Sequence, residues 1–461
     1  MVSFLASKYP YNHKTRSFLL LYKSIWLFFS PLVIFYFVKR SIREPSYRRN
    51  LRERFGFGRS FNSNAIWIHA VSLGEFRASV PLIKELLGRS ERIILTTITP
   101  AGREEAQGLL RDDVDKGNLH IAYLPLEYDF AFNKFISSYR PRFAIVLEYE
   151  LWPVMIASCV RNRVPLVLAQ GQYIEKSFLF DKKWPSLRGA LLKGFDLILA
   201  KSELHSSRYR EFTEGPVETM GELRFDQEIP MQQIAHAKLF LKEFKKKNSR
   251  RSRLCFGSTG PGEDDLLINL MKRMTLKATS EERPKPFYIY VPRHKKDFLK
   301  IQQYLKKSGL NFLNRTDLFD KNLKFNIRPS ACFEKADGLL GDSLGEINFY
   351  FQLADYVFIG NSLNNLGCHN VIEPLALKKR VVVGPSVWGI EYPVVEALAA
   401  GVITIVKSSE ELYQHWQKEI IASKKASQTN RQLNLFCKSH SGATRRCIGK
   451  LKKYQFLPKS K

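Results

Sequence analysis

From Ile66 onward, short apolar segments alternate with amphipathic segments of helical length. The first series of strand-like runs lies at 66–71, 92–99, 119–126, 142–150, 164–170 and 196–202. Runs this apolar are typical of strands that are buried on both faces, as in a parallel sheet covered by helices on both sides. The sequence therefore predicts a doubly wound α/β domain in the first half of the chain.

A second series of the same kind follows in the other half, with runs at 253–259, 287–293, 337–343, 355–362, 380–385 and 402–408. A chain of 461 residues is long enough for about two domains, each with its own core. We therefore expect two successive Rossmann-like domains that face one cleft, where ligands of such folds bind at the carboxyl ends of the strands.

Composition shifts divide the chain further. We expect an N-terminal hydrophobic anchor with a basic flank at 1–45, a first Rossmann-like domain at 46–225, a linker at 226–253, a second Rossmann-like domain at 254–440 and a basic tail at 441–461. The linker prediction depends on the basic run KKKNSRRSR at 245–253, which is typical of an exposed segment.

Residues 17–38 contain 17 apolar residues in 22, enough for a helix of roughly 33 Å. Lys23 and Pro31 interrupt this segment, so a tilted span and a half-inserted monotopic helix are both open. A cleaved signal peptide is disfavoured because no small-residue cleavage site follows. A buried core helix is a further alternative.

Basic residues gather after this segment: Lys39, Arg40, Arg43, Arg48, Arg49, Arg52, Arg54 and Arg59. This bias predicts a single anchor in the cell inner membrane, with the body of the protein in the cytoplasm. Six scattered cysteines without a C-x-x-C pair agree with a reducing compartment and give no support to a zinc site.

The formal net charge of +29 favours anionic partners such as an acidic membrane surface, phosphorylated substrates or nucleic acid. No recognised nucleic-acid module is present, so we expect no nucleic-acid partner.

The motif HAVSLGE at 69–75 stands where a predicted strand ends and a helix begins. Glu75 there can accept a proton from a substrate hydroxyl, or can merely complement the helix dipole. Glu148 and Glu150 end the predicted strand at 142–150, where strand alternation directs both side chains to one face, opposite Tyr149. This pair is either functional or a helix cap.

In the second half, Arg293 follows a predicted strand and suits a phosphate or carboxylate. The loops at 341–346 and 360–374 contain glycines and lead into predicted helices, whose free N–H groups can meet an anion. Glu373 can accept from ribose hydroxyls, and the alternative is an ordinary capped helix. Neither loop matches a Walker A or strict G-x-G-x-x-G sequence.

The motifs HAVSLGE, LEYELWP, GELRFD, VPRH, GDSLGE and GNSLNNLGCHNVIEPLA occur in this order behind a hydrophobic N-terminus. In this they resemble the 3-deoxy-D-manno-octulosonic acid (Kdo) transferases over nearly the whole chain. The resemblance implies a glycosyltransferase of GT-B architecture that moves Kdo from CMP-Kdo to a lipid A precursor in lipopolysaccharide core biosynthesis. It also implies an inverting reaction that needs no metal and no cofactor beyond the donor CMP-Kdo.

The resemblance further implies roles for individual residues. Glu75, in the acceptor domain, would be the catalytic base, and Glu148 and Arg224 would support the transition state. The residues implied for CMP binding, in the donor domain, are Pro292, Arg293, Leu344, Gly345, Glu346, Asn370, Val371, Ile372 and Glu373.

The chain departs from the family pattern at several positions. Arg224 stands where a lysine is usual, and Gly260 replaces the histidine of S-T-H-x-G-E. An asparagine–small–arginine segment is here Gln170-Gly171-Gln172, and Asn361 and Cys368 replace glycines. Two alternative functions are a membrane-bound GT-B lipid glycosyltransferase with another nucleotide sugar and an inactive CMP-binding membrane protein.

Overall fold

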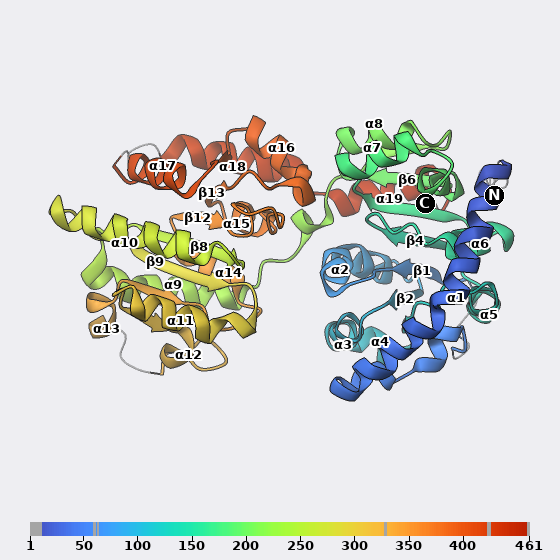
Figure 1. Cartoon of the computed structure of the whole chain (residues 1–461), viewed down its shortest axis with the longest axis horizontal. Coiled ribbons are helices and arrows are strands. Elements are labelled where there is room, and N and C mark those ends of the chain that lie inside the picture. The colour runs from blue at the N-terminus through green and yellow to red at the C-terminus, as the bar shows by residue number, and fades with distance from the viewer. Residues whose placement is uncertain (1–11, 59–60, 62–63, 327–329, 422–425, 459–461) are drawn as a thin grey trace. The chain divides into compact units, whose positions relative to one another are not determined.

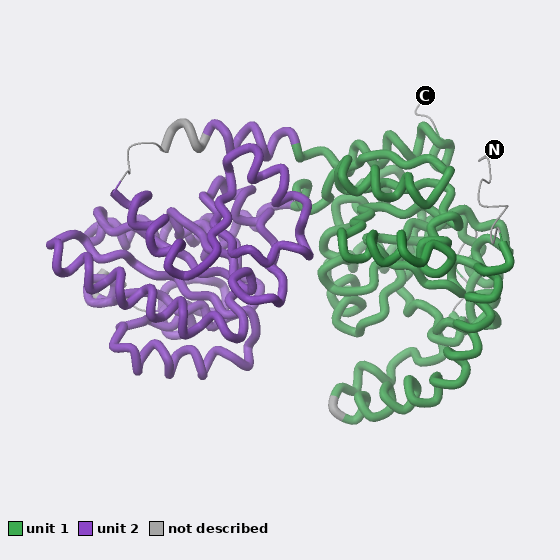
Figure 2. The backbone as a smooth tube through the Cα atoms, turned by 45° about the horizontal axis from the view of Figure 1, so that its top comes forward, with its two compact units in different colours: residues 1–227, 440–461 green, residues 228–439 purple. Residues whose placement is uncertain are grey.

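A computed structural model describes residues 12–58, 61, 64–326, 330–421 and 426–458. The chain forms two compact units (Figure 2). Unit 1 consists of residues 1–227 and 440–461, and unit 2 of residues 228–439. Each unit contains a parallel seven-stranded sheet (Figure 1), as the alternation of apolar and amphipathic segments predicted.

The sheet of unit 1 has the strand order β3-β2-β1-β4-β5-β6-β7. Its strands are β1 (Ile66–His69), β2 (Ile93–Thr97), β3 (Leu119–Tyr123), β4 (Phe143–Leu147), β5 (Leu166–Gly171), β6 (Leu197–Ala200) and β7 (Val217–Thr219). Successive residues of a strand point to opposite faces, so Ile66 and Ile68 pack into one apolar layer and Trp67 into the other. Both faces of the sheet are therefore core.

Helices cover both faces of this sheet. They are α2 (Leu73–Gly88), α3 (Pro100–Leu109), α4 (Arg111–Asp115), α5 (Asp129–Tyr139), α6 (Pro153–Arg161), α7 (Glu175–Lys183), α8 (Glu203–Arg210) and α19 (Ala443–Lys453), with the 3₁₀ helices η2 (Pro45–Arg48), η3 (Leu51–Phe55), η4 (Arg188–Gly194) and η5 (Leu223–Asp226). Ser72 and Thr99 cap α2 and α3 by accepting from backbone N–H groups of the first turn. These caps fix the start of each helix just after its strand.

Unit 2 has the strand order β10-β11-β9-β8-β12-β13-β14. Its strands are β8 (Arg253–Thr259), β9 (Phe287–Pro292), β10 (Phe312–Asn314), β11 (Gly338–Leu340), β12 (Tyr356–Ile359), β13 (Arg380–Val383) and β14 (Ile403–Ile405). Its helices are α9 (Met231–Asn248), α10 (Asp264–Ser280), α11 (Phe298–Lys307), α12 (Arg315–Leu318), α13 (Ser330–Lys335), α14 (Ile347–Leu353), α15 (Ile372–Ala376), α16 (Glu391–Ala399), α17 (Ser409–Ile421) and α18 (Ala426–His440), with the 3₁₀ helices η6 (Lys295–Asp297) and η7 (Trp388–Ile390).

The segment expected to be a linker at 226–253 is instead largely helix α9, which belongs to unit 2. Phe240 and Phe244 are fully buried, and their rings contact Phe287 and Phe333. The basic run at 245–253 starts in the last turn of α9 and ends in β8. The expectation of an exposed linker is wrong because the lysines at 245–247 lie on a helix whose other face is core, and the run continues into a core strand.

The expected basic tail at 441–461 also differs from the structure. Helix α19 packs into unit 1, where Cys447 and Leu451 are fully buried beside the sheet. Asp226 anchors the start of this segment by accepting from the N–H groups of Gly442 at 2.5 Å and Thr444 at 2.7 Å. Unit 1 is thus completed by the segment that follows unit 2.

The apolar N-terminal segment forms the 31-residue helix α1 (His13–Arg43), with Pro31 inside it. Among the described residues it is the one helix long and apolar enough to cross a membrane. Leu19 packs into the core layer that contains helices α5 and α6. Of the basic flank, Arg54 is buried, Arg48, Arg49 and Arg52 are exposed, and Arg59 lies outside the described residues.

Candidate active site

The carboxyl ends of β1 and β4 lie side by side in the sheet of unit 1, where the two strands pair in parallel. Strands β2 and β3 lie beyond β1, whereas β5, β6 and β7 lie beyond β4, so the direction of winding reverses between them. Open parallel sheets bind ligands beside such a reversal because the loops diverge there. Glu75 follows β1 and Glu148 follows β4, so both belong to this point of the fold.

Glu75 lies in the first turn of α2 and is held by the turn that precedes the helix. Its Oε2 accepts from Val71 N at 2.6 Å, and its Oε1 accepts from Ser72 Oγ at 3.1 Å. Burial, and then the nearby charge of Glu148, raise the pKa of Glu75 to about 7. The residue therefore caps the helix and also has the proton affinity of a base that works near neutral pH.

Glu148 has the opposite electrostatic setting. Its Oε1 accepts from Arg224 Nη2 at 3.1 Å and from Lys201 Nζ at 3.4 Å. Burial alone would raise the pKa of Glu148, but the charges of Lys201 and Arg224 outweigh it and lower the pKa to about 2. Glu148 is thus a fixed negative charge, and the structure places Arg224 beside it.

Glu150 joins the two other carboxylates, although not by strand alternation. Strand β4 ends at Leu147, and Glu148 has a left-handed φ of 60°, so the strand predicted to reach residue 150 is shorter than expected. Burial, and then the charges of Glu75 and Glu148, raise the pKa of Glu150 to about 8. Tyr149 turns to another partner and donates to Asp181 Oδ2 at 2.6 Å.

Lys201 is a central residue of this site that the sequence did not single out. It follows β6 and its side chain is 2% exposed, with Nζ 2.9 Å from Glu222 Oε2 and 2.8 Å from Gln172 Oε1. Glu222 is equally buried and also accepts from Arg224 Nη1 at 3.2 Å. A cation at the end of an apolar strand, in the run DLILAKS, is the signal that could have identified it.

Two departures from the family pattern find their explanation here. Gln170 is fully buried, and its Oε1 accepts from Leu223 N at 3.1 Å, so it holds η5 and with it the backbone that carries Arg224. Gln172, which replaces an arginine of the pattern, accepts from Lys201 Nζ. Lys201 thus places a cation beside position 172.

In unit 2, Pro292 ends β9 and is buried, whereas the side chain of Arg293 is exposed. Burial, and then the charges of Arg293 and His294, lower the pKa of His369 to about 4. Arg293 and the loop before Asn370 are therefore close together, and His369 is neutral at physiological pH.

The loop at 341–346 follows β11. Leu344 and Gly345 are exposed in it. Glu346 forms a two-pronged ion pair with the buried Arg315, at 2.7 Å to Nε and 2.5 Å to Nη2. Ser343 Oγ donates to the same carboxylate at 2.5 Å. Arg315 was not predicted, and it neutralises Glu346 and orders the loop.

The last predicted group lies at the start of α15. Asn370 Oδ1 accepts from Ile372 N at 3.0 Å, while the side chains of Val371 and Ile372 are buried. The side chain of Glu373 is half-buried. For Val371 and Ile372, contact with a ligand is thus restricted to the backbone.

The winding of the unit 2 sheet reverses between β8 and β12. Glu263 is fully buried there and accepts from Asn361 N at 2.5 Å and Leu363 N at 2.9 Å. Gly260 lies against the side chain of Asn361, since a Cβ at position 260 would be 2.8 Å from Asn361 Cγ. Two departures from the family pattern, at 260 and 361, are therefore in contact.

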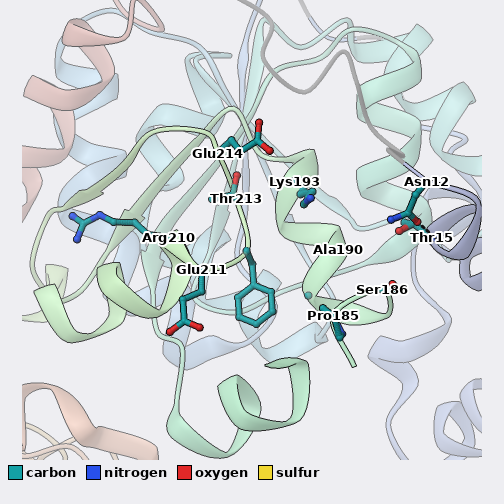
Figure 3. A pocket seen from close by; sticks show the side chains of 12 residues that line it. Asn12, Thr15, Pro185, Ser186, Ala190, Lys193, Arg210, Glu211, Thr213 and Glu214 are labelled. Carbon is teal, nitrogen blue, oxygen red and sulfur yellow. Dashed lines mark hydrogen bonds between the residues drawn. The ribbon is translucent and has the colours of Figure 1, made fainter. Parts of the chain in front are cut away.

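A cavity of about 340 Å³ lies elsewhere in unit 1, where the start of α1 meets η4 and the end of α8 (Figure 3). Asn12, Thr15, Lys193 and Arg210 are among its lining residues, and none of the predicted site residues is. Within the part of the chain that the structure describes, no cluster of three or more His, Cys, Asp or Glu side chains is placed to hold a metal ion.

Comparison with solved structures supports the fold. A glycosyltransferase from Rickettsia africae superposes with a TM-score of 0.53 at 13% identity, covering 86% of this chain and 99% of that one. The predicted fold class, α/β with the GT-B pair of Rossmann-like domains, is confirmed.

Comparison of sequences identifies the family. The model of a family described as 3-deoxy-D-manno-octulosonic-acid transferase matches residues 49–227. The 3-deoxy-D-manno-octulosonic acid transferase of Bordetella pertussis is 30% identical over 389 residues, which is 84% of this chain and 86% of the relative. That of Haemophilus influenzae is 29% identical over 373 residues, 79% of this chain and 81% of the relative. This chain belongs to the 3-deoxy-D-manno-octulosonic acid transferase family.

Proposed function

We propose that this glycosyltransferase moves Kdo from CMP-Kdo to a lipid A precursor. Membership of the family supports the donor and the acceptor. The observation that carries the chemistry is the carboxylate cluster of unit 1, in which Glu75 has a near-neutral pKa beside the permanently charged Glu148.

In the proposed reaction, Glu75 accepts the proton of an acceptor hydroxyl as that oxygen attacks the anomeric carbon of Kdo. A bond forms between the acceptor oxygen and this carbon, the bond from the carbon to the phosphate oxygen of CMP breaks, and CMP leaves from the opposite face. The anomeric centre is inverted, and the proton remains on Glu75 until solvent removes it. The fixed charge of Glu148 favours this step because it raises the proton affinity of Glu75.

Arg224 is the proposed support for negative charge in the transition state. The side chain of Arg224 is 22% exposed, in contrast to the buried Lys201, so it keeps a surface for an anionic group. Preorganised cations of this kind act by stabilising charge that develops during the reaction. We expect no metal ion to be required, and a chelator should leave turnover unchanged.

The proposed CMP site in unit 2 combines Pro292 and Arg293, the loop with Leu344, Gly345 and Glu346, and the segment from Asn370 to Glu373. Arg293 supplies an exposed cation for the phosphate. Arg315 neutralises Glu346, which reduces the repulsion that an unpaired carboxylate would exert on CMP. The loop can then approach the nucleotide through its backbone.

We further propose that the enzyme acts at the cytoplasmic face of the inner membrane. The apolar helix α1 and the exposed Arg48, Arg49 and Arg52 support this location, because juxtamembrane cations are attracted to anionic lipid. The proposed acceptor is itself an amphiphile of that membrane.

The test is an assay of purified full-length protein with a lipid A precursor and CMP-Kdo generated in place, followed by mass analysis of the lipid. The expected product carries added Kdo, and the E75Q variant should bind CMP but form no product. Turnover with a UDP-sugar but not with CMP-Kdo would contradict the donor assignment, and near-normal turnover by E75Q would contradict the assignment of the base.

A further inference from the structure

Helix α1 runs along unit 1 (Figure 1), and Leu19 near its start packs into the core of that unit. Thr15, Leu19, Ser30 and Ser41 are each less than 10% exposed. These positions recur at helical spacing, so they form one stripe of the helix, and this stripe faces the body of the protein.

Specific contacts hold this stripe in place. Lys23 Nζ is 2.7 Å from Asp129 Oδ2, and the ring of Trp26 lies 6.2 Å from that of Tyr128. Near the other end, the guanidinium of the buried Arg54 lies 4.6 Å from the ring of Phe37. The helix is therefore anchored to unit 1 at both ends and in between.

The opposite face of α1 consists of exposed apolar side chains. Phe28 is 77% exposed, Phe35 is 63% exposed and Leu21 is 60% exposed. Further exposed apolar residues of this face and its borders are Leu20, Ile25, Leu27, Phe29, Leu32, Ile34, Val38 and Ile42.

The polarity of α1 is thus the reverse of that of a surface helix in a water-soluble protein. Such a helix buries its apolar side and exposes its polar side, whereas α1 turns Thr15, Lys23, Ser30 and Ser41 toward the protein and large apolar residues outward. Since a continuous apolar surface of this kind marks an interaction site, the outer face requires an apolar partner.

The geometry also excludes a crossing of the bilayer by a helix docked in this way. The contacts from Leu19 to Phe37 cover about 27 Å of helix at 1.5 Å per residue, which approaches the roughly 30 Å thickness of the hydrocarbon core. A bilayer crossed by α1 would have to lie between the helix and the body that it contacts along this distance.

We propose that α1 lies in the plane of an anionic leaflet, with its outer face in the acyl chains and both of its ends on the same side as the body. Exposed cations accompany both ends of the helix: Lys14 and Arg16 before the apolar face, and Lys39, Arg48, Arg49 and Arg52 after it. Their charge matches acidic headgroups, which identifies the partner as a lipid surface rather than a second protein. This inference rests on the proposed function, in which the acceptor is a membrane lipid.

Depth measurements on full-length protein bound to vesicles test the proposal. Leu21, Phe28 and Phe35 are spaced by seven residues on the outer face, so L21C, F28C and F35C each place one fluorescent label there. The parent protein carries C332S and C437S, which remove the two half-buried native thiols. Labelling of the parent without an introduced cysteine gives the background.

The label depth is read from quenching by lipids that carry a bromine or doxyl group at known positions along the acyl chain. An in-plane helix places all three labels at one shallow depth, whereas a spanning helix places successive labels about 10 Å apart along the membrane normal. A depth difference of that size would overturn the proposal while leaving Kdo transfer intact. If no lipid quenches the labels and the protein is a dimer in solution, the proposal is wrong, and a second copy of the chain covers the outer face of α1.

A protease applied to an epitope tag fused before Met1 gives a second, independent readout. In sealed vesicles that contain phosphatidylglycerol, the tag should be cleaved from the same side as the body, and vesicles without anionic lipid should bind less protein. A tag that is protected until detergent is added would overturn the in-plane arrangement.

Discussion

The side chain of Asn361 occupies the space that a side chain at position 260 would need, and Gly260 leaves that space free. Asn361 has a left-handed φ of 63°, a conformation that glycine adopts at no steric cost. The replacement of histidine by Gly260 and that of glycine by Asn361 therefore depend on each other, at the point where the winding of the unit 2 sheet reverses.

The coupling predicts a non-additive pair of substitutions. G260H alone should lower the free energy of unfolding of unit 2 by about 1–3 kcal/mol through overpacking, and weaken CMP binding. The double variant G260H/N361G should recover most of both, which thermal unfolding and CMP titration would measure. G389A, at a glycine with open space around it, is the matched control. Strictly additive effects would contradict the coupling.

Glu75 predicts a pH dependence of turnover. Because a base must be unprotonated, kcat/KM should fall as the pH is lowered through about 7, the pKa of Glu75. E85Q, on the exposed side of the same helix, should keep this profile. If kcat/KM of the parent enzyme does not fall as the pH is lowered through about 7, Glu75 is not the base.

The same raised pKa has a consequence for stability. Glu75 ionises less readily in the folded protein than in the unfolded chain, so its charge destabilises the fold progressively as the pH rises from about 4.5 to 7. E75Q should therefore raise the unfolding temperature at pH 8 and change it little at pH 4. A variant that is equally affected at both pH values would show that hydrogen bonding rather than charge dominates.

Replacing Lys201, a residue that the family resemblance did not single out, should have a large effect on the stability of unit 1. K201M leaves Glu222 buried beside Arg224 alone and should cost about 3–5 kcal/mol of stability. K201M/E222Q should recover part of this loss, and K182M, which breaks an exposed pair with Glu211, should cost less than about 1 kcal/mol. Denaturant unfolding would measure these values, and equal costs for K201M and K182M would refute the role.

Arg315 predicts an effect on nucleotide affinity. R315M leaves Glu346 without its cation, so the affinity for CMP should fall roughly 10-fold or more through repulsion of the phosphate and loss of loop order. R315M/E346Q should restore much of it. R273M, at an exposed ion pair of unit 2, is the control. Unchanged CMP affinity in R315M would exclude the loop from the site.

All strands of the two sheets except β7 and β10 could be predicted from the sequence, because a strand buried on both faces is a continuous apolar run. Strands β7 and β10 are three residues long and only half-buried, so they lack that signal. Glu75 could be placed because the motif at 69–75 stands where a predicted strand ends and a predicted helix begins, and α2 does begin there. Lys201 and Arg315 could not be identified, because the role of a buried cation depends on its partners. Here these partners, Glu222, Glu346 and Glu148, lie 21 to 53 residues away along the chain.

Helix α9 is a segment for which the sequence prediction of an exposed linker was wrong. Its lysines dominate the local composition, but the four apolar residues Ile234, Ala237, Phe240 and Phe244 recur at helical spacing and are buried. The periodicity of these apolar residues predicts the helix correctly, whereas the number of charged residues led to the wrong prediction of a linker.

The return of the chain to unit 1 at residue 440 has a consequence for biosynthesis. The ribosome makes α19 after all the strands of both sheets, so the strip of core that α19 covers stays open to water until this helix has been made. A chain that stops before α19 would leave this apolar strip uncovered, and we expect it to be cleaved by proteases faster than a chain that includes the helix.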